Sequence, residues 1–240
     1  MKLIDIYNIL DEVSPFELQE KWDNSGIMLG DKEQNITNIV LSLDIDEVLI
    51  ENCEENSLII THHPIIFSGV KQMDYSTYPS NLLHKMIKKN ISNIAMHTNF
   101  DKTHLNKYVL ESVLGYKIEK EEDFLLYFSV NDSFENFTSK VKNAFGLDIM
   151  RVVKCHEEVK TAALCTGSGS SLIKSVQADC FLTGDLKYHE AMEAKSINLS
   201  MLDVNHYESE RFFAEILASY LEIKDITVII SESKNPFTYL

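Results

Sequence analysis

The sequence lacks the features that stabilise or anchor a protein by means other than a packed core. Its 240 residues contain four cysteines, Cys53, Cys155, Cys165 and Cys180, and no C-x-x-C pair that would indicate a zinc or redox site. We expect these thiols to be free and mostly buried. No apolar run approaches the roughly 18 residues of a membrane span, and the first residues open an amphipathic pattern instead of a signal peptide. We therefore expect a cytoplasmic protein without a membrane segment.

Positive charge is also scarce. The chain has 22 Lys and Arg against 37 Asp and Glu, which gives a formal net charge of −15. Nucleic-acid binding requires Lys and Arg to neutralise phosphates, so a role in binding DNA or RNA is disfavoured. An acidic field attracts cations, as suits a metalloprotein, although it is also an ordinary solubility feature. A Walker-type phosphate loop is absent as well, so no motif fixes a nucleotide.

Apolar residues are abundant and follow an alternating pattern of helices and strands. They make up 45% of the chain, enough for one large α/β domain or two small ones. Helical spacing covers residues 3–13 and ends at Ser14-Pro15, and short apolar runs that follow read as buried strands separated by helices. The acidic stretch at residues 119–123 looks like a junction. We predict two similar α/β lobes, residues 1–120 and 121–240.

A pair of histidines follows the strand predicted at residues 58–61. His62 and His63 stand before Pro64, which has no N–H to donate and ends the strand. Adjacent side chains in a strand point to opposite faces, so the two imidazoles can share a site only where the strand becomes a loop. Ligands commonly bind at the carboxyl ends of such strands. The alternative is a pair of surface histidines.

Two later strand ends repeat one arrangement. An apolar run at residues 91–96 leads to His97 and Asp101, and another at residues 199–204 leads to His206 and Glu210. In each case an imidazole and a carboxylate stand four residues apart, on one face if the segment turns into a helix. A duplicated pair of α/β lobes facing each other across a cleft is the simplest interpretation. A further strand, at residues 180–183, leads to a segment that contains His189.

Two loops have less specific patterns. Trp22-Asp23-Asn24-Ser25-Gly26 is typical of a turn, and the plain interpretation is a structural loop packed by the single tryptophan. The small residues at 167–171 precede a predicted helix and could admit an anion at its N-terminus, although that signal is weak by itself.

Five motifs in this order resemble the Nif-three-like family, also called the dinuclear metal-centre or type 2 GTP cyclohydrolase I family. They cover nearly the whole chain. The resemblance implies two α/β lobes packed around a central dinuclear metal cleft, and a toroidal homohexamer. Longer members carry an inserted middle domain that is absent here. The motifs are Trp22-Asp23-Asn24-Ser25-Gly26, Ile60-Thr61-His62-His63-Pro64, His97-Thr98-Asn99-Phe100-Asp101, Leu182-Thr183-Gly184-Asp185-Leu186-Lys187-Tyr188-His189 and Asn205-His206-Tyr207-Glu208-Ser209-Glu210.

The resemblance implies five metal ligands, His62, His63, Asp101, His206 and Glu210. Three imidazoles and two carboxylates without a thiolate suit Zn, Mn, Fe, Co or Ni better than Ca. Five ligands are too many for one catalytic zinc, and they fit two divalent ions if a carboxylate bridges. Paired ions of this kind activate water and polarise phosphoryl or carbonyl oxygens, which is typical of hydrolases.

Two further histidines, His97 and His189, are candidate catalytic residues. Each can be a sixth ligand, a hydrogen-bond partner that orients a ligand, a proton shuttle or a structural residue. His84, His104 and His156 have no motif around them, and we expect them at the surface.

We predict a metal-dependent hydrolase of a small-molecule substrate, resembling GTP cyclohydrolase type 2 homologues. The alternative is a non-enzymatic metal-handling or scaffold ring protein. In the family the residue before the last histidine is commonly Gly, whereas this chain has Asn205, which raises the question of its turn geometry.

Overall fold

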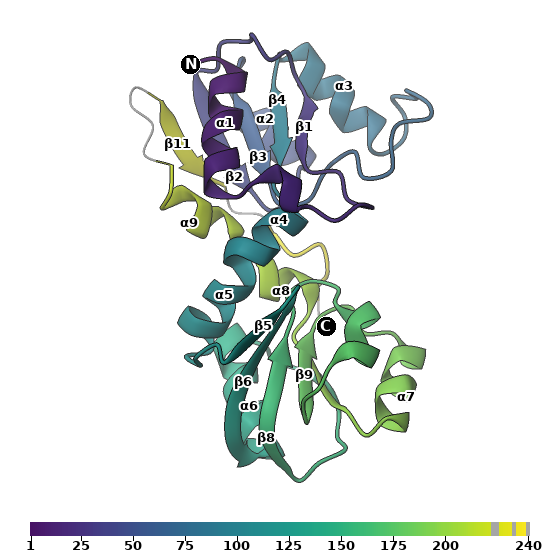
Figure 1. Cartoon of the computed structure of the whole chain (residues 1–240). Helices are drawn as coiled ribbons and strands as arrows, with labels where there is room; N and C mark the ends of the chain where they lie inside the picture. The colour runs from purple at the N-terminus through teal and green to yellow at the C-terminus, as the bar shows by residue number, and fades with distance from the viewer. Residues whose placement is uncertain (222–225, 232–233, 239–240) are drawn as a thin grey trace. The chain divides into compact units, whose positions relative to one another are not determined.

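The computed structural model describes residues 1–221, 226–231 and 234–238, and it contains two β-sheets with helices against them (Figure 1). Contacts divide the chain into two compact units. Unit 1 comprises Met1–Phe100 and Phe213–Pro236, and unit 2 comprises Asp101–Phe212 with the last residues from Phe237. The predicted α/β class with two lobes is confirmed. Among the described residues, no helix is both long and apolar enough to cross a membrane.

The division of contacts differs from the predicted halves, residues 1–120 and 121–240. The boundary falls between Phe100 and Asp101, and the segment from Phe213 belongs to unit 1. The reason is strand pairing: β11 (Thr227–Ile230) pairs in parallel with β2 (Asn38–Ser42) and so extends the first sheet. The acidic stretch that suggested a junction instead forms β5 (Lys120–Glu122), which pairs with β6 in the second sheet.

The sheet of unit 1 has the order β1-β4-β3-β2-β11. The four strands from β4 to β11 are parallel, and β1 is antiparallel to β4. This parallel arrangement matters for the site because it places the carboxyl ends of β2, β3 and β4 at one edge. The bounds not yet given are β1 Gly26–Leu29, β3 Leu58–Thr61 and β4 Ser92–Ala95.

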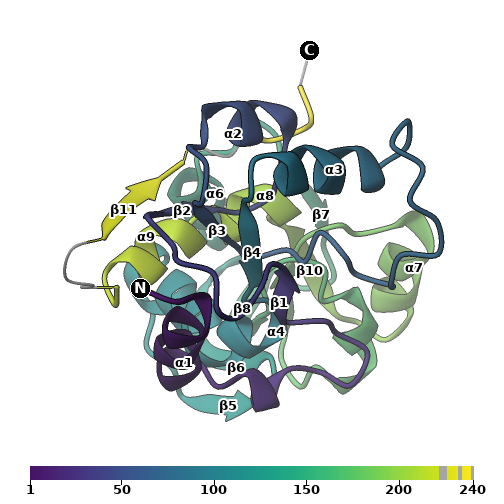
Figure 2. The same ribbon diagram turned by 90° about the horizontal axis from the view of Figure 1, so that it is seen from above.

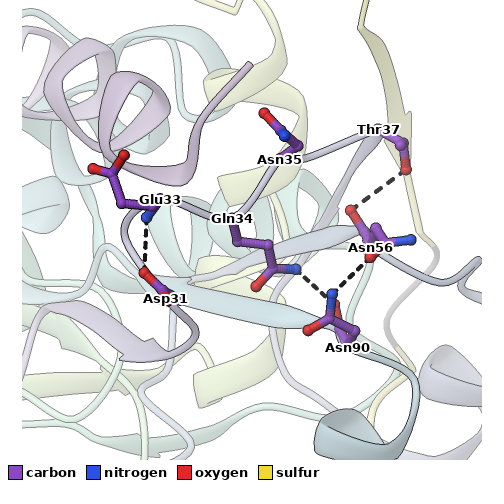
Figure 3. A pocket seen from close by; sticks show the side chains of 7 residues that line it. All are labelled: Asp31, Glu33, Gln34, Asn35, Thr37, Asn56 and Asn90. Atoms are coloured by element: carbon purple, nitrogen blue, oxygen red, sulfur yellow. Dashed lines mark hydrogen bonds between the residues drawn. The ribbon is translucent and has the colours of Figure 1, made fainter.

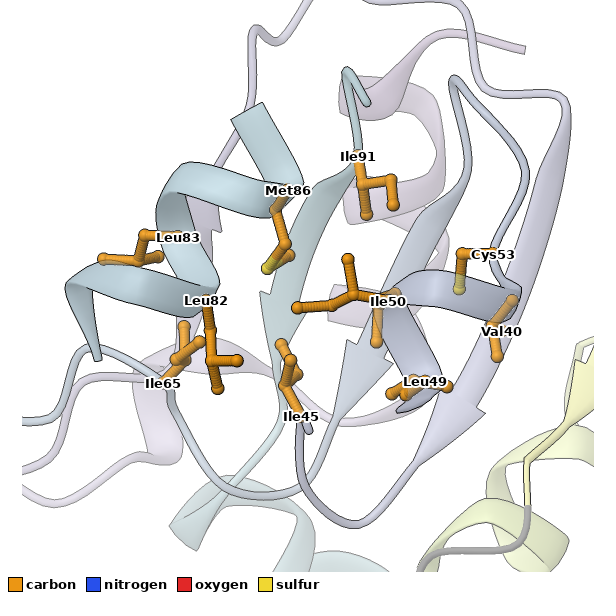
Figure 4. Close-up of a cluster of buried hydrophobic side chains, with 11 residues drawn as sticks. Val40, Ile45, Leu49, Ile50, Cys53, Ile65, Leu82, Leu83, Met86 and Ile91 are labelled. Carbon is orange, nitrogen blue, oxygen red and sulfur yellow. The ribbon is translucent and has the colours of Figure 1, made fainter. Parts of the chain in front are cut away.

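Helices cover both faces of this sheet. Figure 2 shows α2 (Glu47–Asn52) and α3 (Ser80–Lys88) on one face, and α1 (Leu3–Val13) and α9 (Phe213–Ala218) on the other. A cluster under α2 and α3 buries Val40, Ile50, Ile59, Leu83 and Met86, several of which are drawn in Figure 4. Because side chains alternate along a strand, the neighbours of Val40 and Ile59 serve the opposite core.

The sheet of unit 2 has the order β5-β6-β8-β9-β10-β7. Its middle strands β8, β9 and β10 are parallel, and antiparallel strands flank them on both sides. The carboxyl ends of the three parallel strands therefore also meet at one edge. The bounds are β6 Leu125–Ser133, β7 Arg151–Val153, β8 Glu158–Leu164, β9 Cys180–Thr183 and β10 Ser200–Asp203.

Helices also cover the sheet of unit 2. Helix α6 (Phe134–Phe145) is capped by Ser133, whose side chain accepts a hydrogen bond from the Asn136 N–H, and it ends at Gly146 with φ of 69°. Helix α7 (Tyr188–Ser196) and a 3₁₀ helix (Ser170–Ser175) contribute to a second apolar cluster around Phe181.

The remaining helices follow the strand ends. Residues 98–113 form one continuous helical run, composed of α4 (Thr98–Phe100), a π-helix (Asp101–Leu105), α5 (Asn106–Tyr108) and a second π-helix (Val109–Val113). Helix α8 (His206–Glu210) follows β10. A 3₁₀ turn, Phe16–Leu18, follows α1.

Two local expectations were wrong. Trp22 does not pack its loop into the core, because 60% of its surface is exposed. The small-residue turn at 167–171 leads into the short 3₁₀ helix instead of an α-helix, so it offers no α-helical N-terminus for an anion.

Candidate metal centre

Three histidines of unit 1 form one group at the carboxyl edge of its sheet. Strand β3 ends at Thr61, just before His62 and His63, and β4 ends two residues before His97. Because β3 and β4 are adjacent and parallel, these loops emerge side by side. Each ring offers a nitrogen within 4.8 Å of a nitrogen of the other two. The predicted end of the strand thus brings two consecutive histidines to one site.

The two rings of the histidine pair are held through Nδ1. His62 is buried, and its Nδ1 lies 2.9 Å from the carbonyl oxygen of Met96. His63 Nδ1 lies 2.9 Å from Oδ1 of Asp44, the second residue after β2. A carbonyl or carboxylate oxygen can only accept, so Nδ1 carries the proton and the lone pair of the neutral ring is on Nε2. This is the tautomer in which metal-bound histidines are commonly held.

His97 is held in the same way by Asp23 of the turn after α1. Its Nδ1 lies 2.7 Å from Asp23 Oδ1, and the Thr98 N–H donates to Oδ2 at 3.1 Å. Burial favours the neutral carboxyl of Asp23, but the hydrogen bonds from His97, Thr98 and Asn24 outweigh it and lower the pKa of Asp23 well below its usual value. Asp23 is therefore a buried anion that orients the His97 ring.

Three further candidate ligands, one imidazole and two carboxylates, lie within unit 2. His206 and Glu210 stand at the two ends of α8, and His206 Nε2 lies 2.9 Å from Glu210 Oε2, which confirms the predicted shared helix face. His206 Nδ1 lies 2.7 Å from Asp185 Oδ2. Asp101, which begins the π-helix, is buried, and one of its oxygens lies within 4.8 Å of an oxygen of the buried Glu210.

Special backbone positions shape this part of unit 2. Asn205 has φ of 60° and ψ of 157°, a conformation suited to glycine, so Asn205 keeps the turn geometry at a cost in strain. A Cβ on Gly184 would lie 2.6–2.8 Å from backbone atoms of Asn205 and His206. A Cβ on Gly167 would lie 2.0 Å from Glu210 Oε1. Glycine is therefore required at 167 and 184, because residues 205–210 approach these positions too closely for a Cβ atom.

The other predicted histidines lie elsewhere. His189 is exposed on α7 with its ring against Tyr188, and none of the metal-holding groups among the described residues includes it. Its catalytic role stays a prediction. His84, His104 and His156 are partly buried instead of fully exposed, and burial lowers the pKa of His104.

The carboxylates that hold the rings were not predicted as site residues. Asp44 and Asp185 each lie two residues after the end of a strand, β2 and β9, at the same sheet edges as the histidines, so strand-end position was a usable signal. Asp23 lies in a motif that was interpreted as a structural loop. The expected free thiols are present, and burial together with the nearby Asp101 and Glu210 charges raises the pKa of Cys165 well above its usual value.

A separate polar pocket of about 580 Å³ lies at the other end of the unit 1 sheet (Figure 3). Thr37, Asn56 and Asn90 precede β2, β3 and β4, whereas the histidines follow β3 and β4. Asn90 Nδ2 donates to Asn56 Oδ1 at 2.6 Å, and Gln34 donates to the Asn90 carbonyl at 2.7 Å. These bonds join the loops that enter the strands, and the pocket is lined by Asp31, Glu33, Gln34, Asn35, Thr37, Asn56 and Asn90.

Comparison with known proteins places the chain among relatives of similar length. It is 52% identical over 240 residues to a protein of Campylobacter jejuni named GTP cyclohydrolase 1 type 2 homolog, with both chains fully covered. It is 42% identical over 234 residues to GTP cyclohydrolase 1 type 2 of Helicobacter pylori, covering 97% of this chain and 96% of that protein.

Similarity to solved structures extends over the whole fold. A crystal structure of a hypothetical protein of Staphylococcus aureus matches with a TM-score of 0.86 at 25% identity, covering 100% of this chain and 99% of that one. The model of the Duf34/NIF3 (NGG1p interacting factor 3) family matches residues 1–236. The chain therefore belongs to the Duf34/NIF3 family.

Proposed function

We propose that this protein binds two divalent metal ions through His62, His63, Asp101, His206 and Glu210 and acts as a metal-dependent hydrolase. The observation that carries the proposal is the Nδ1 hydrogen bond of each of these three histidines to a carbonyl or carboxylate oxygen. Such bonds fix the ring orientation and leave Nε2 as the donor for a metal.

The donor set fits two ions of the Zn, Mn, Fe, Co or Ni type. The five side chains comprise three imidazoles and the carboxylates of Asp101 and Glu210, whose negative charges would offset the cations. Glu210 is the best candidate for a bridging ligand because its carboxylate lies close to both His206 and Asp101. When bound, two such ions supply an activated water and polarise a carbonyl or phosphoryl oxygen of the substrate.

The protein side chains have separate tasks around these ions. Asp44 and Asp185 accept hydrogen bonds from Nδ1 of His63 and His206 and so orient the two rings. His97 is the sixth candidate ligand, since it belongs to the same group as His62 and His63. The names of the relatives make hydrolytic opening of a guanine ring the first reaction to test.

The test compares Glu210→Gln with Glu208→Gln. The first change keeps the size of a buried side chain and removes the charge needed to hold two cations, so we expect at most one ion per chain. The second change lies two residues away on α8 and should leave both ions. Metal content by mass spectrometry and far-UV circular dichroism are the readouts, with the dichroism expected to be unchanged. If the Glu210 variant retained two ions, Glu210 would not be a metal ligand.

Activity is measured separately on the metal-loaded protein with nucleotides, phosphoesters and cyclic amides. We expect turnover of a compound in this panel that is lost in Glu210→Gln. Bound metal without turnover of any compound would favour the alternative, a metal-handling or scaffold ring. The homohexameric state and the cytoplasmic location stay predictions.

A further inference from the structure

Two exposed aromatic rings stand beside the histidine group of unit 1. Trp22 is 60% exposed and Phe67 is 49% exposed, so both rings are accessible from solvent. Their ring centroids lie 6.4 and 6.2 Å from that of His97 and 6.1 Å from each other. The three rings therefore form one aromatic corner next to the candidate ligands.

The loops that carry these rings are tied to each other and to the site. Asn24 Nδ2 donates to the Ile66 carbonyl at 2.5 Å, which joins the residues next to the aromatic pair. Asp23, which follows Trp22 directly, is the acceptor for His97. The turn after α1 thus connects the tryptophan, the loop of Phe67 and a candidate ligand. Such anchoring reduces the entropy lost when a ligand binds.

We propose that Trp22 and Phe67 form a stacking pair that binds a planar heteroaromatic ring of the substrate and places it beside the metal ligands. The proposal deepens the proposed hydrolase function and rests on it for the identity of the ring as part of a substrate. It also assigns a task to the turn motif at residues 22–26, beyond orienting His97.

The geometry favours a ring over other occupants. Trp22 and Phe67 meet at 52°, and both meet His97 at 79°, so none of the three pairs is stacked in parallel. Both aromatic rings are about half exposed, and flat π-systems gain from offset or tilted contact with such rings. The position at the carboxyl edge of a parallel sheet is also where α/β proteins bind small ligands.

The single tryptophan makes the test direct, because all tryptophan emission comes from Trp22. The metal-loaded protein is titrated with guanosine and adenosine, with ribose 5-phosphate as the probe that has no planar ring. We expect saturable quenching by at least one nucleoside and none by ribose 5-phosphate. No saturable quenching by either nucleoside would overturn the stacking pair.

The matched variants are Phe67→Leu and Tyr75→Leu. Both aromatics lie between β3 and α3 and are similarly exposed, but Tyr75 stacks on His84 at 3.8 Å, away from the aromatic corner. Removing one stacking ring should weaken nucleoside binding by about 5- to 150-fold, equivalent to about 1–3 kcal/mol. Phe67→Tyr should restore it, and Tyr75→Leu should leave it unchanged. Equal affinity in the wild type and Phe67→Leu would overturn the proposal.

Two further readouts separate the possible failures. Metal content should be unchanged in Phe67→Leu. Bound metal without quenching by nucleosides would contradict only the stacking pair. Quenching by nucleosides without bound metal would contradict only the metal centre. A blue shift of Trp22 emission with rising protein concentration would show that a second copy of the chain covers the aromatic corner, which would also overturn the proposal.

Discussion

Replacing Gly167 by Ala should remove metal from the protein without unfolding it. The added Cβ would lie 2.0 Å from Glu210 Oε1 and 3.1 Å from Glu210 Cδ, whereas real Cβ atoms essentially never approach closer than 3.0 Å. The carboxylate must then move by about 1 Å, since 3.0 − 2.0 = 1.0. Glu210 is only 3% exposed, so its side chain cannot swing into water.

The size of the effect follows from the tolerance of metal coordination. Ligand distances vary by about 0.2 Å in a competent site, so a shift of about 1 Å removes the oxygen from its ideal position. We expect metal affinity to fall by about 10- to 100-fold, equivalent to about 1.4–2.7 kcal/mol. The left-handed backbone, with φ of 63°, adds about 1–2 kcal/mol of destabilisation for any L residue.

The control variant is Gly146→Ala, which separates these two effects. Gly146 has φ of 69° at the end of α6, and a Cβ there would meet no atom within 4 Å. Both variants should lower the urea midpoint by a similar backbone cost, but only Gly167→Ala should lose metal. Isothermal titration with Zn²⁺ after chelation measures the affinity. Unchanged affinity in Gly167→Ala, or an equal loss in both variants, would refute the reasoning.

Three other outcomes are expected. Burial raises the pKa of Asp203 despite its Arg151 partner, so the folded state loses stability as pH rises from about 3.8. Arg151→Met should therefore lower the free energy of unfolding, measured in urea, by about 1–3 kcal/mol at pH 7 and by less at pH 4. An equal loss at both pH values would contradict this. Asn205→Gly should raise the free energy of unfolding by about 1 kcal/mol, because the relieved backbone strain exceeds the added entropy of the unfolded chain, and it should leave the metal content unchanged. A lower urea midpoint would contradict this. Metal content after dialysis should fall below about pH 6, where protons compete for the imidazoles, and constant content down to about pH 4 would mean that histidines are not ligands.

Local signals along the sequence were sufficient for most of the fold. Apolar spacing predicted α1 closely, because an apolar stripe along a helix is set within a few turns. The short buried strands β3, β4, β9 and β10 were also predicted, since apolar runs before polar strand ends are distinctive. Strand β11 was not, because its parallel pairing with β2 joins segments nearly 190 residues apart and has no local signature.

The candidate ligands were found from the sequence because family motifs mark them, whereas the residues that orient them were not. The pairings of His63 with Asp44, and of His206 with Asp185, join the loops after two different strands. Only the parallel order of the strands brings these loops to one edge, and spacing along the chain does not report that order.

The role of the glycines also could not be predicted from the sequence, because it depends on which distant residues approach them. The run at 167–171 was a weak signal for an anion site, because small residues before a helix leave its first N–H groups accessible. In the structure the missing side chain of Gly167 instead leaves the space that the Glu210 carboxylate occupies, and Gly184 leaves space for the backbone before His206. A glycine in the sequence can indicate that other atoms approach its Cα closely, but only the folded structure identifies those atoms. At Gly167 the approaching atoms belong to the candidate ligands Glu210 and His206, and at Gly184 they belong to the backbone of Asn205 and His206, so both glycines are as much a part of the proposed centre as the side chains that would bind the ions.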